Sequence, residues 1–156
     1  MNDLLKRKAF IVSLIRKMKE SGSWTGETHI QKCTFFLEEF FMVPLNYKFI
    51  LYKHGPFSSG KLANILEKKH INFIKKNKDF INFIIEKLAN RSVKELERVA
   101  TALYVKKKEK IMNNEKMVER IIELKPHITK PLAEEAVNEL KSYYSQAKEK
   151  GLVNSL

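Results

Sequence analysis

Apolar residues recur at intervals of three and four along most of this chain, and charged residues fill the positions between them. In the first segment, Leu4, Ile11 and Leu14 share one face of a helix that we expect over residues 3–20. The same spacing predicts further helices over residues 28–41, 79–89, 93–104, 117–124 and 131–151. The chain is therefore expected to be mainly α-helical.

Three of these helices begin with recognisable signals. The segments Thr28–Gln31 and Ser92–Glu95 both have the capping-box form, in which the first and fourth residues satisfy free amides of the first turn. Pro131 fits the first turn of the last helix, where its missing amide costs nothing.

One stretch departs from the helical pattern. Residues 47–53 alternate apolar and basic side chains on aromatic and β-branched types, which predicts a short, half-buried strand. Gly55-Pro56 ends that strand, and Ser58 or Ser59 can then cap a short helix that runs to Lys69. Ile71–Ile74 is a second candidate strand, followed by a wing-like segment that carries more lysines.

Length and hydropathy indicate one globular domain. A chain of 156 residues with 44% hydrophobic content is long enough for a single core. Lys or Glu interrupts every apolar stretch before it reaches the roughly 20 residues of a membrane helix. The first residues, Met1-Asn2-Asp3, do not have the pattern of a secretory signal. We expect a cytoplasmic protein with no membrane partner.

The charge balance points to an acidic partner. Thirty Lys and Arg residues against 18 Asp and Glu residues give a net charge of +12. Such an excess creates a surface field that attracts nucleic acid or an acidic protein.

Residues that would carry catalysis or bind a cofactor are sparse. Cys33 is the only cysteine and lies among apolar residues, as a small buried side chain would. The four histidines form no metal-ligand spacing, and the five isolated glycines form no phosphate-binding loop. We expect no enzyme activity, no catalytic residue, no metal and no cofactor.

Nucleic-acid binding is better supported than catalysis, and the alternative for the lysines concerned is an ordinary solvated face. The candidate contact residues surround the helix expected from Ser58 to Lys69, and lysines there would neutralise phosphates without specifying sequence. They are Lys53, His54, Ser59, Lys61, Asn64, Lys68, Lys69, Lys75 and Lys76. Base readout would need residues such as Asn64 or Ser59 at base edges, and no arginine is there to contact guanine in a bidentate way.

A family resemblance covers most of the chain. Thr28-His29-Ile30-Gln31-Lys32 and Tyr52-Lys53-His54-Gly55-Pro56-Phe57-Ser58 resemble the Gly-Pro-[Tyr/Phe]-Ser region of the YwgA-like bacterial proteins. The chain is similar, more distantly, to the Panacea domain of SocA-like antitoxins. The segments 95–104 and 124–136 also resemble the later helices of that group.

The resemblance implies a mainly helical, winged-helix-like domain with a short strand or wing and additional C-terminal helices. We accordingly expect a single domain, with a winged-helix-like core at 1–78 and a packed helical extension at 79–156. It also implies a non-catalytic regulator, or a component of a defence or toxin–antitoxin system. After His70 the sequence lacks the family's Tyr-x-Leu-Thr-x-x-Gly wing strand.

The alternative is an adaptor or antitoxin-like module that binds an acidic partner protein, such as a toxin or effector subunit. The aromatic residues Tyr47, Tyr52 and Phe57 could then form an anchor patch.

Overall fold

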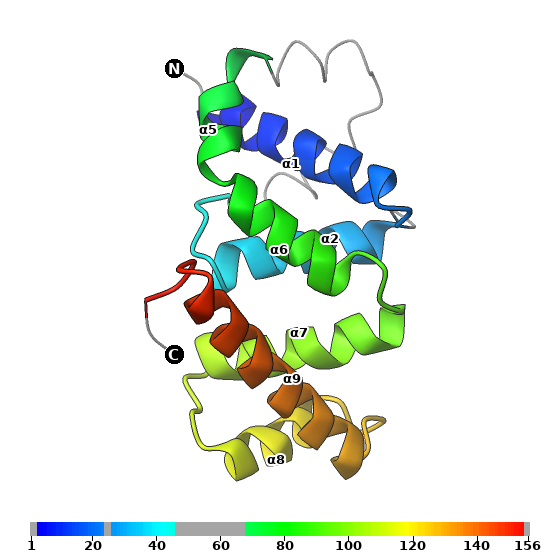
Figure 1. Ribbon diagram of the computed structural model, residues 1–156. Helices are drawn as coiled ribbons and strands as arrows, with labels where there is room; N and C mark the ends of the chain where they lie inside the picture. The colour runs from blue at the N-terminus through cyan, green and yellow to red at the C-terminus, as the bar shows by residue number, and fades with distance from the viewer. Residues whose placement is uncertain (1–2, 24–25, 46–67, 155–156) are drawn as a thin grey trace. The chain divides into compact units, whose positions relative to one another are not determined.

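The computed structural model describes residues 3–23, 26–45 and 68–154 (Figure 1). The described residues form helices and no strands, which confirms the mainly α-helical prediction. The predicted β wing is not seen among them. The helices are α1 (Asp3–Glu20), α2 (Glu27–Glu39), α5 (Ile71–Lys76), α6 (Lys78–Leu88), α7 (Val93–Lys107), α8 (Asn114–Leu124) and α9 (Lys130–Glu149). None of these helices is long and apolar enough to cross a membrane.

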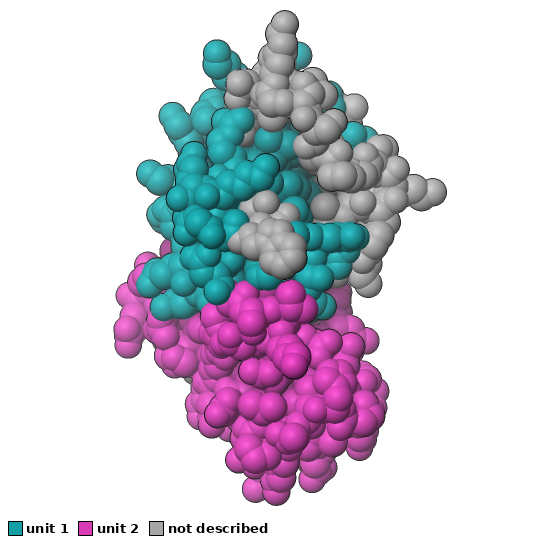
Figure 2. Space-filling view, turned by 90° about the vertical axis from the view of Figure 1, so that its right-hand side faces the viewer, with its two compact units in different colours: residues 1–38, 42–90 teal, residues 39–41, 91–156 magenta. Residues whose placement is uncertain are grey.

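The chain forms two compact units, coloured separately in Figure 2. Unit 1 comprises residues 1–38 and 42–90, and unit 2 comprises residues 39–41 and 91–156. Each unit has its own buried apolar side chains. The predicted single-domain organisation, with its division at residue 78, stays a prediction.

Unit 1 is built on α1. This helix contacts both α5 and α6, which also contact each other (Figure 1). The side chains that these three helices bury include Phe10, Ile11, Leu14, Ile74, Ile81 and Ile84, and α2 buries Cys33, Phe36 and Leu37. The Ser23 hydroxyl donates to the Ala89 carbonyl, and the Asn90 amide donates to the Ser21 carbonyl at 3.2 Å. These two bonds join the end of α1 to the end of α6.

Unit 2 is a three-helix unit in which α9 packs against both α7 and α8, and α7 also contacts α8. Its fully or almost fully buried side chains include Leu96, Leu103, Met117, Ile121 and Leu140. At the end of α9, Gly151 has a φ of +72° and Leu152 donates to the Ala147 carbonyl at 2.8 Å. A glycine adopts this left-handed conformation at little cost, so the helix ends where the sequence predicted.

Two of the three predicted helix starts are confirmed. The Ser92 hydroxyl accepts from the Glu95 amide at 3.2 Å, and the Glu95 carboxylate accepts from the Ser92 amide at 3.3 Å, which completes the capping box. Pro131 lies in the first turn of α9.

The predicted capping box at Thr28 is wrong. The helix begins one residue earlier, at Glu27, and the Gly26 carbonyl accepts the first helical bond, from Ile30, at 3.1 Å. Gln31 donates to the Glu27 carboxylate at 3.0 Å. A carboxylate in the first turn is favoured by the helix dipole, and glycine is tolerated at the cap.

The candidate strand Ile71–Ile74 is also a wrong assignment, because these residues form the first part of α5. Packing against α1 decides the conformation, because Ile74 is buried and the centres of the Phe73 and Phe10 rings are 5.5 Å apart. The Asn77 side chain donates to the Phe73 carbonyl at 2.9 Å and satisfies an acceptor that the helix end leaves free.

The Ser92 cap gives a direct stability test. Replacing Ser92 with Ala removes the acceptor for the Glu95 amide and should lower the free energy of unfolding by about 1 kcal/mol. Chemical denaturation measures the loss. The control is Ser145→Ala at an exposed position inside α9, which should cause no loss; equal stability of the two variants would contradict the role of the cap.

Candidate nucleic-acid interface

A run of exposed lysines begins just before α5 and ends at the start of α6. Lys68 and Lys69 precede the helix, Lys75 and Lys76 form its last turn, and Lys78 begins α6. The segment from residue 68 to residue 78 contains no Asp or Glu, and none of the five lysines forms an ion pair with another described residue. We call these five residues the α5 lysine surface. Asp79 follows directly after the last of them, but it forms no ion pair with these lysines.

Helix α1 adds a further cation next to this surface. The Lys6 ammonium lies 4.4 Å from the centre of the Phe73 ring, and the ring also contacts Phe10. Such a cation–π contact holds the charge near α5 while keeping it partly exposed. Sequence reasoning missed Lys6, although its spacing of four from Phe10 places both on one helix face.

The structure describes only some of the predicted contact residues. Lys68, Lys69, Lys75 and Lys76 are exposed, as a contact role requires. The others, Lys53, His54, Ser59, Lys61 and Asn64, lie outside the described residues, and so do the aromatic residues Tyr47, Tyr52 and Phe57 of the alternative prediction. Their contribution stays a prediction.

The setting of two predicted residues needs correction. Lys75 and Lys76 were expected on a wing-like segment, but they lie in the last turn of a helix. That position suits them, since the carbonyl groups at a helix C-terminus favour positive charge. The lysines are therefore presented by a helix end that is packed on α1, instead of by a wing.

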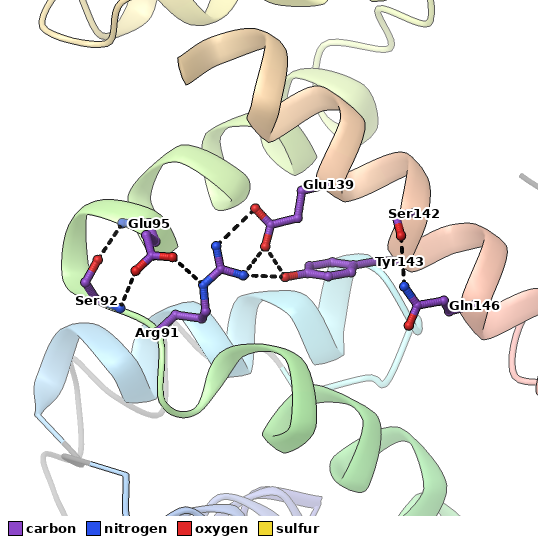
Figure 3. A network of polar contacts seen from close by, with 7 residues as sticks. All are labelled: Arg91, Ser92, Glu95, Glu139, Ser142, Tyr143 and Gln146. Atoms are coloured by element: carbon purple, nitrogen blue, oxygen red, sulfur yellow. Dashed lines mark hydrogen bonds and ion pairs between the residues drawn. The ribbon is translucent and has the colours of Figure 1, made fainter. Parts of the chain in front are cut away.

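Unit 2 contains an extended network of polar contacts around Arg91 (Figure 3). The guanidinium donates to Glu95 at 2.7 Å and to Glu139 at 3.2 Å, and it also donates to the Tyr143 hydroxyl at 3.1 Å. The Tyr143 hydroxyl in turn donates to Glu139. The network joins the start of α7 to the middle of α9.

Protonation in this network fits a structural role. Burial and the neighbouring Glu139 carboxylate raise the pKa of Tyr143, so its phenol stays protonated. Burial acts to lower the pKa of Arg91, but its hydrogen bonds to Glu139 and Glu95 outweigh that effect and raise it. Both Arg91 and Tyr143 therefore keep their protons at neutral pH.

Several other described groups that could support catalysis are engaged or buried. His127 pairs with Glu97 at 2.5 Å on the surface, and Arg120 pairs with Glu109 at 2.7 Å. Cys33 is completely buried, and burial raises its pKa to about 12, so it is not a thiolate at neutral pH. No group of three or more His, Cys, Asp or Glu residues in the described part of the chain could hold a metal ion.

Comparisons of the chain with family models, with curated proteins and with solved structures found no match. The resemblance to YwgA-like and Panacea proteins stays a prediction, and the functional argument depends on the surface described above.

The burial of Cys33 predicts slow chemical modification. Iodoacetamide at about pH 8 should leave Cys33 unmodified in the native protein and label it rapidly in denaturant, because the thiolate is the reactive form. Mass spectrometry measures the labelled fraction over time. Rapid labelling of the native chain would show that Cys33 is accessible and ionised.

The Ser92–Glu95–Arg91 contacts predict a pH dependence of stability. Hydrogen bonds from Ser92 and Arg91 lower the pKa of Glu95 below its ordinary value of 4.5. A lowered pKa means that the stabilisation is present above about pH 4.5 and is lost as the pH falls. Glu95→Gln should therefore lose less stability than the wild type between about pH 6 and pH 3. Glu135→Gln, at an exposed position of α9, is the control and should keep the wild-type pH dependence.

Proposed function

We propose that this protein is a non-catalytic binding protein that holds nucleic acid through the α5 lysine surface and Lys6. The observation that supports this most directly is the absence of acidic partners: five exposed lysines occur within eleven residues, and no described carboxylate pairs with them. A local excess on one helix end favours a polyanionic partner.

The kinds of residue present favour phosphate contacts over sequence readout. Lysine ammonium groups bind phosphate oxygens as point charges, whereas the usual contact to guanine is a bidentate arginine. The segment 68–78 contains no arginine. Asn72 is exposed between the two lysine pairs and is the group there that is best suited to contact a base edge. Under this proposal, binding is strongly salt-dependent and weakly sequence-specific.

A second candidate is an acidic partner protein, and one observation favours it. Leu5 on α1 and Ile71 on α5 are large apolar side chains with exposed fractions of 37% and 39%. An apolar anchor surrounded by charge is typical of a protein interface. Nucleic acid remains the first choice, because the lysines outnumber these two anchors and because phosphate contacts need no apolar side chain.

The experiment compares two variants with the same change in charge. The test variant replaces Lys68, Lys69, Lys75 and Lys76 with Gln, and the control replaces Lys94, Lys116, Lys130 and Lys148, which are exposed helical lysines of unit 2. Binding to a labelled duplex DNA and to a single-stranded RNA is measured by fluorescence anisotropy at several salt concentrations. If each lysine neutralises one phosphate of duplex DNA, the slope of log affinity against log salt should become shallower by about 3 to 4 in the test variant.

The control variant should keep a slope close to that of the wild type. Equal losses in the two variants would mean that net charge alone attracts nucleic acid, and the proposed interface would be wrong. An unaffected test variant would also contradict it. If the wild type binds neither nucleic acid but retains an acidic protein that Leu5→Ser and Ile71→Ser release, the second candidate is favoured.

A further inference from the structure

Unit 2 contains a cavity of about 210 Å³ that is separate from the α5 lysine surface. It is formed by the end of α7, the start of α8 and the middle of α9. The residues that line it include Lys106, Asn114, Lys141 and Tyr144. The lining combines apolar side chains with two ammonium groups and one phenol, and it includes no carboxylate.

The cations at this cavity lack acidic partners. Lys106 and Lys141 line it, Lys107 is close enough to repel Lys106, and none of the three forms an ion pair with a described residue. Burial, followed by the charges of Lys107 and Lys141, lowers the pKa of Lys106. Several other cations of unit 2 are paired: Arg91, Lys108, Arg120 and Lys125 all contact carboxylates. Lys106 and Lys141 therefore bring positive charge to this cavity that no described ion pair offsets.

Tyr144 holds the Lys106 ammonium at this cavity. Its ring is stacked against Phe40, with ring centres 4.1 Å apart, and the Lys106 ammonium lies 4.3 Å from the ring centre. Only 4% of the residue is exposed, and its hydroxyl has no hydrogen-bond partner among residues 3–23, 26–45 and 68–154. Burial and the Glu39 carboxylate raise its pKa to about 12, so the hydroxyl remains a donor. The hydroxyl oxygen is itself buried, so a group in the cavity would lie against the Tyr144 ring and not on its hydroxyl.

The start of α8 adds backbone amide donors. Asn114 is the first residue of this eleven-residue helix, and the Asn113 side chain caps the Lys116 amide at 3.0 Å. The first amides of a helix have no acceptor within the helix and favour an anion. The Glu115 carboxylate already lies in this first turn, so the positive charge of the site comes from the two lysines.

We propose that this cavity binds a phosphate group, held by the ammonium groups of Lys106 and Lys141. A phosphate monoester carries close to two negative charges at neutral pH and can match two lysines, whereas a carboxylate carries one. The volume is below the roughly 300 Å³ of a typical drug-sized pocket, so it suits a phosphate group with a small attachment. The group could come from a small phosphorylated compound or from a nucleic-acid backbone. The two sources share the same chemistry at this site.

The test uses the full chain and amide NMR spectra at a fixed ionic strength. Inorganic phosphate, adenosine monophosphate, acetate and an oligonucleotide without terminal phosphates are titrated separately, with sodium chloride as the reference. We expect phosphate or the oligonucleotide to cause saturable shifts concentrated at Lys106, Asn114, Lys141 and Tyr144. Shifts with phosphate and the monophosphate indicate a small ligand, and shifts with the oligonucleotide alone indicate a backbone phosphate.

Variants test whether Lys106 and Lys141 each contribute to phosphate binding. Lys106→Met keeps the aliphatic stem and Lys141→Gln keeps a polar side chain, and each should weaken phosphate binding by about tenfold or more, as the loss of a charge-assisted hydrogen bond would. Lys148→Gln, at an exposed site on α9, is the control and should change nothing. Should Lys106→Met fail to fold, Lys106→Gln and Lys141→Gln still decide the question. Non-saturable shifts, equal affinity for acetate and phosphate, or unchanged binding in the variants would overturn the proposal.

This proposal does not depend on the α5 lysine surface. The variant that lacks Lys68, Lys69, Lys75 and Lys76 should retain the phosphate-induced shifts in unit 2 whether or not it binds nucleic acid. Loss of those shifts in that variant would contradict a separate phosphate site in unit 2.

Discussion

Eighteen carboxylates share this chain with thirty lysines and arginines, so at least twelve cations have no acidic partner under one-to-one pairing. For the binding of a partner, the location of the unpaired charges matters more than their number. In unit 2, carboxylates form ion pairs with neighbouring cations, as Glu95 and Glu139 do with Arg91. In unit 1 the segment 68–78 has five exposed lysines and no carboxylate of its own. Exposed pairs contribute little to stability, so this unequal distribution concerns binding more than folding.

The position of the α5 lysine surface follows from packing in unit 1. Ile74 is buried and Phe73 contacts Phe10 of α1, so α5 is fixed through its apolar side. Lys75 and Lys76 follow directly in the last turn, where the helix end favours them. A helix of six residues would not be stable alone, and its charges are presented in a defined place because α1 supports it.

Long, regularly patterned helices could be predicted from the sequence. The predicted helix over 3–20 is α1, and the Ser92 capping box forms as expected, because both depend on contacts between residues close in the chain. Ile71–Ile74 could not be assigned in the same way. Four residues of apolar and β-branched type fit a strand or a helix, and only their contact with α1, about sixty residues away in sequence, decides between the two.

The candidate site was predictable in part for the same reason. Composition and local clustering identified Lys68, Lys69, Lys75 and Lys76, which are exposed. Lys6 was not identified, because its place beside α5 depends on a contact across the fold. The cavity near Tyr144 had no local signal at all: Lys106 and Lys141 are on different helices and meet only when α7 packs against α9.

Lysine footprinting tests the central claim most directly. The protein is acetylated at low reagent concentration with and without duplex DNA or RNA, and the modification of each lysine is measured by mass spectrometry. The account predicts strong protection of Lys6, Lys68, Lys69, Lys75 and Lys76, with little change at Lys94, Lys116 and Lys148. Uniform protection of all exposed lysines, or protection confined to unit 2, would contradict it.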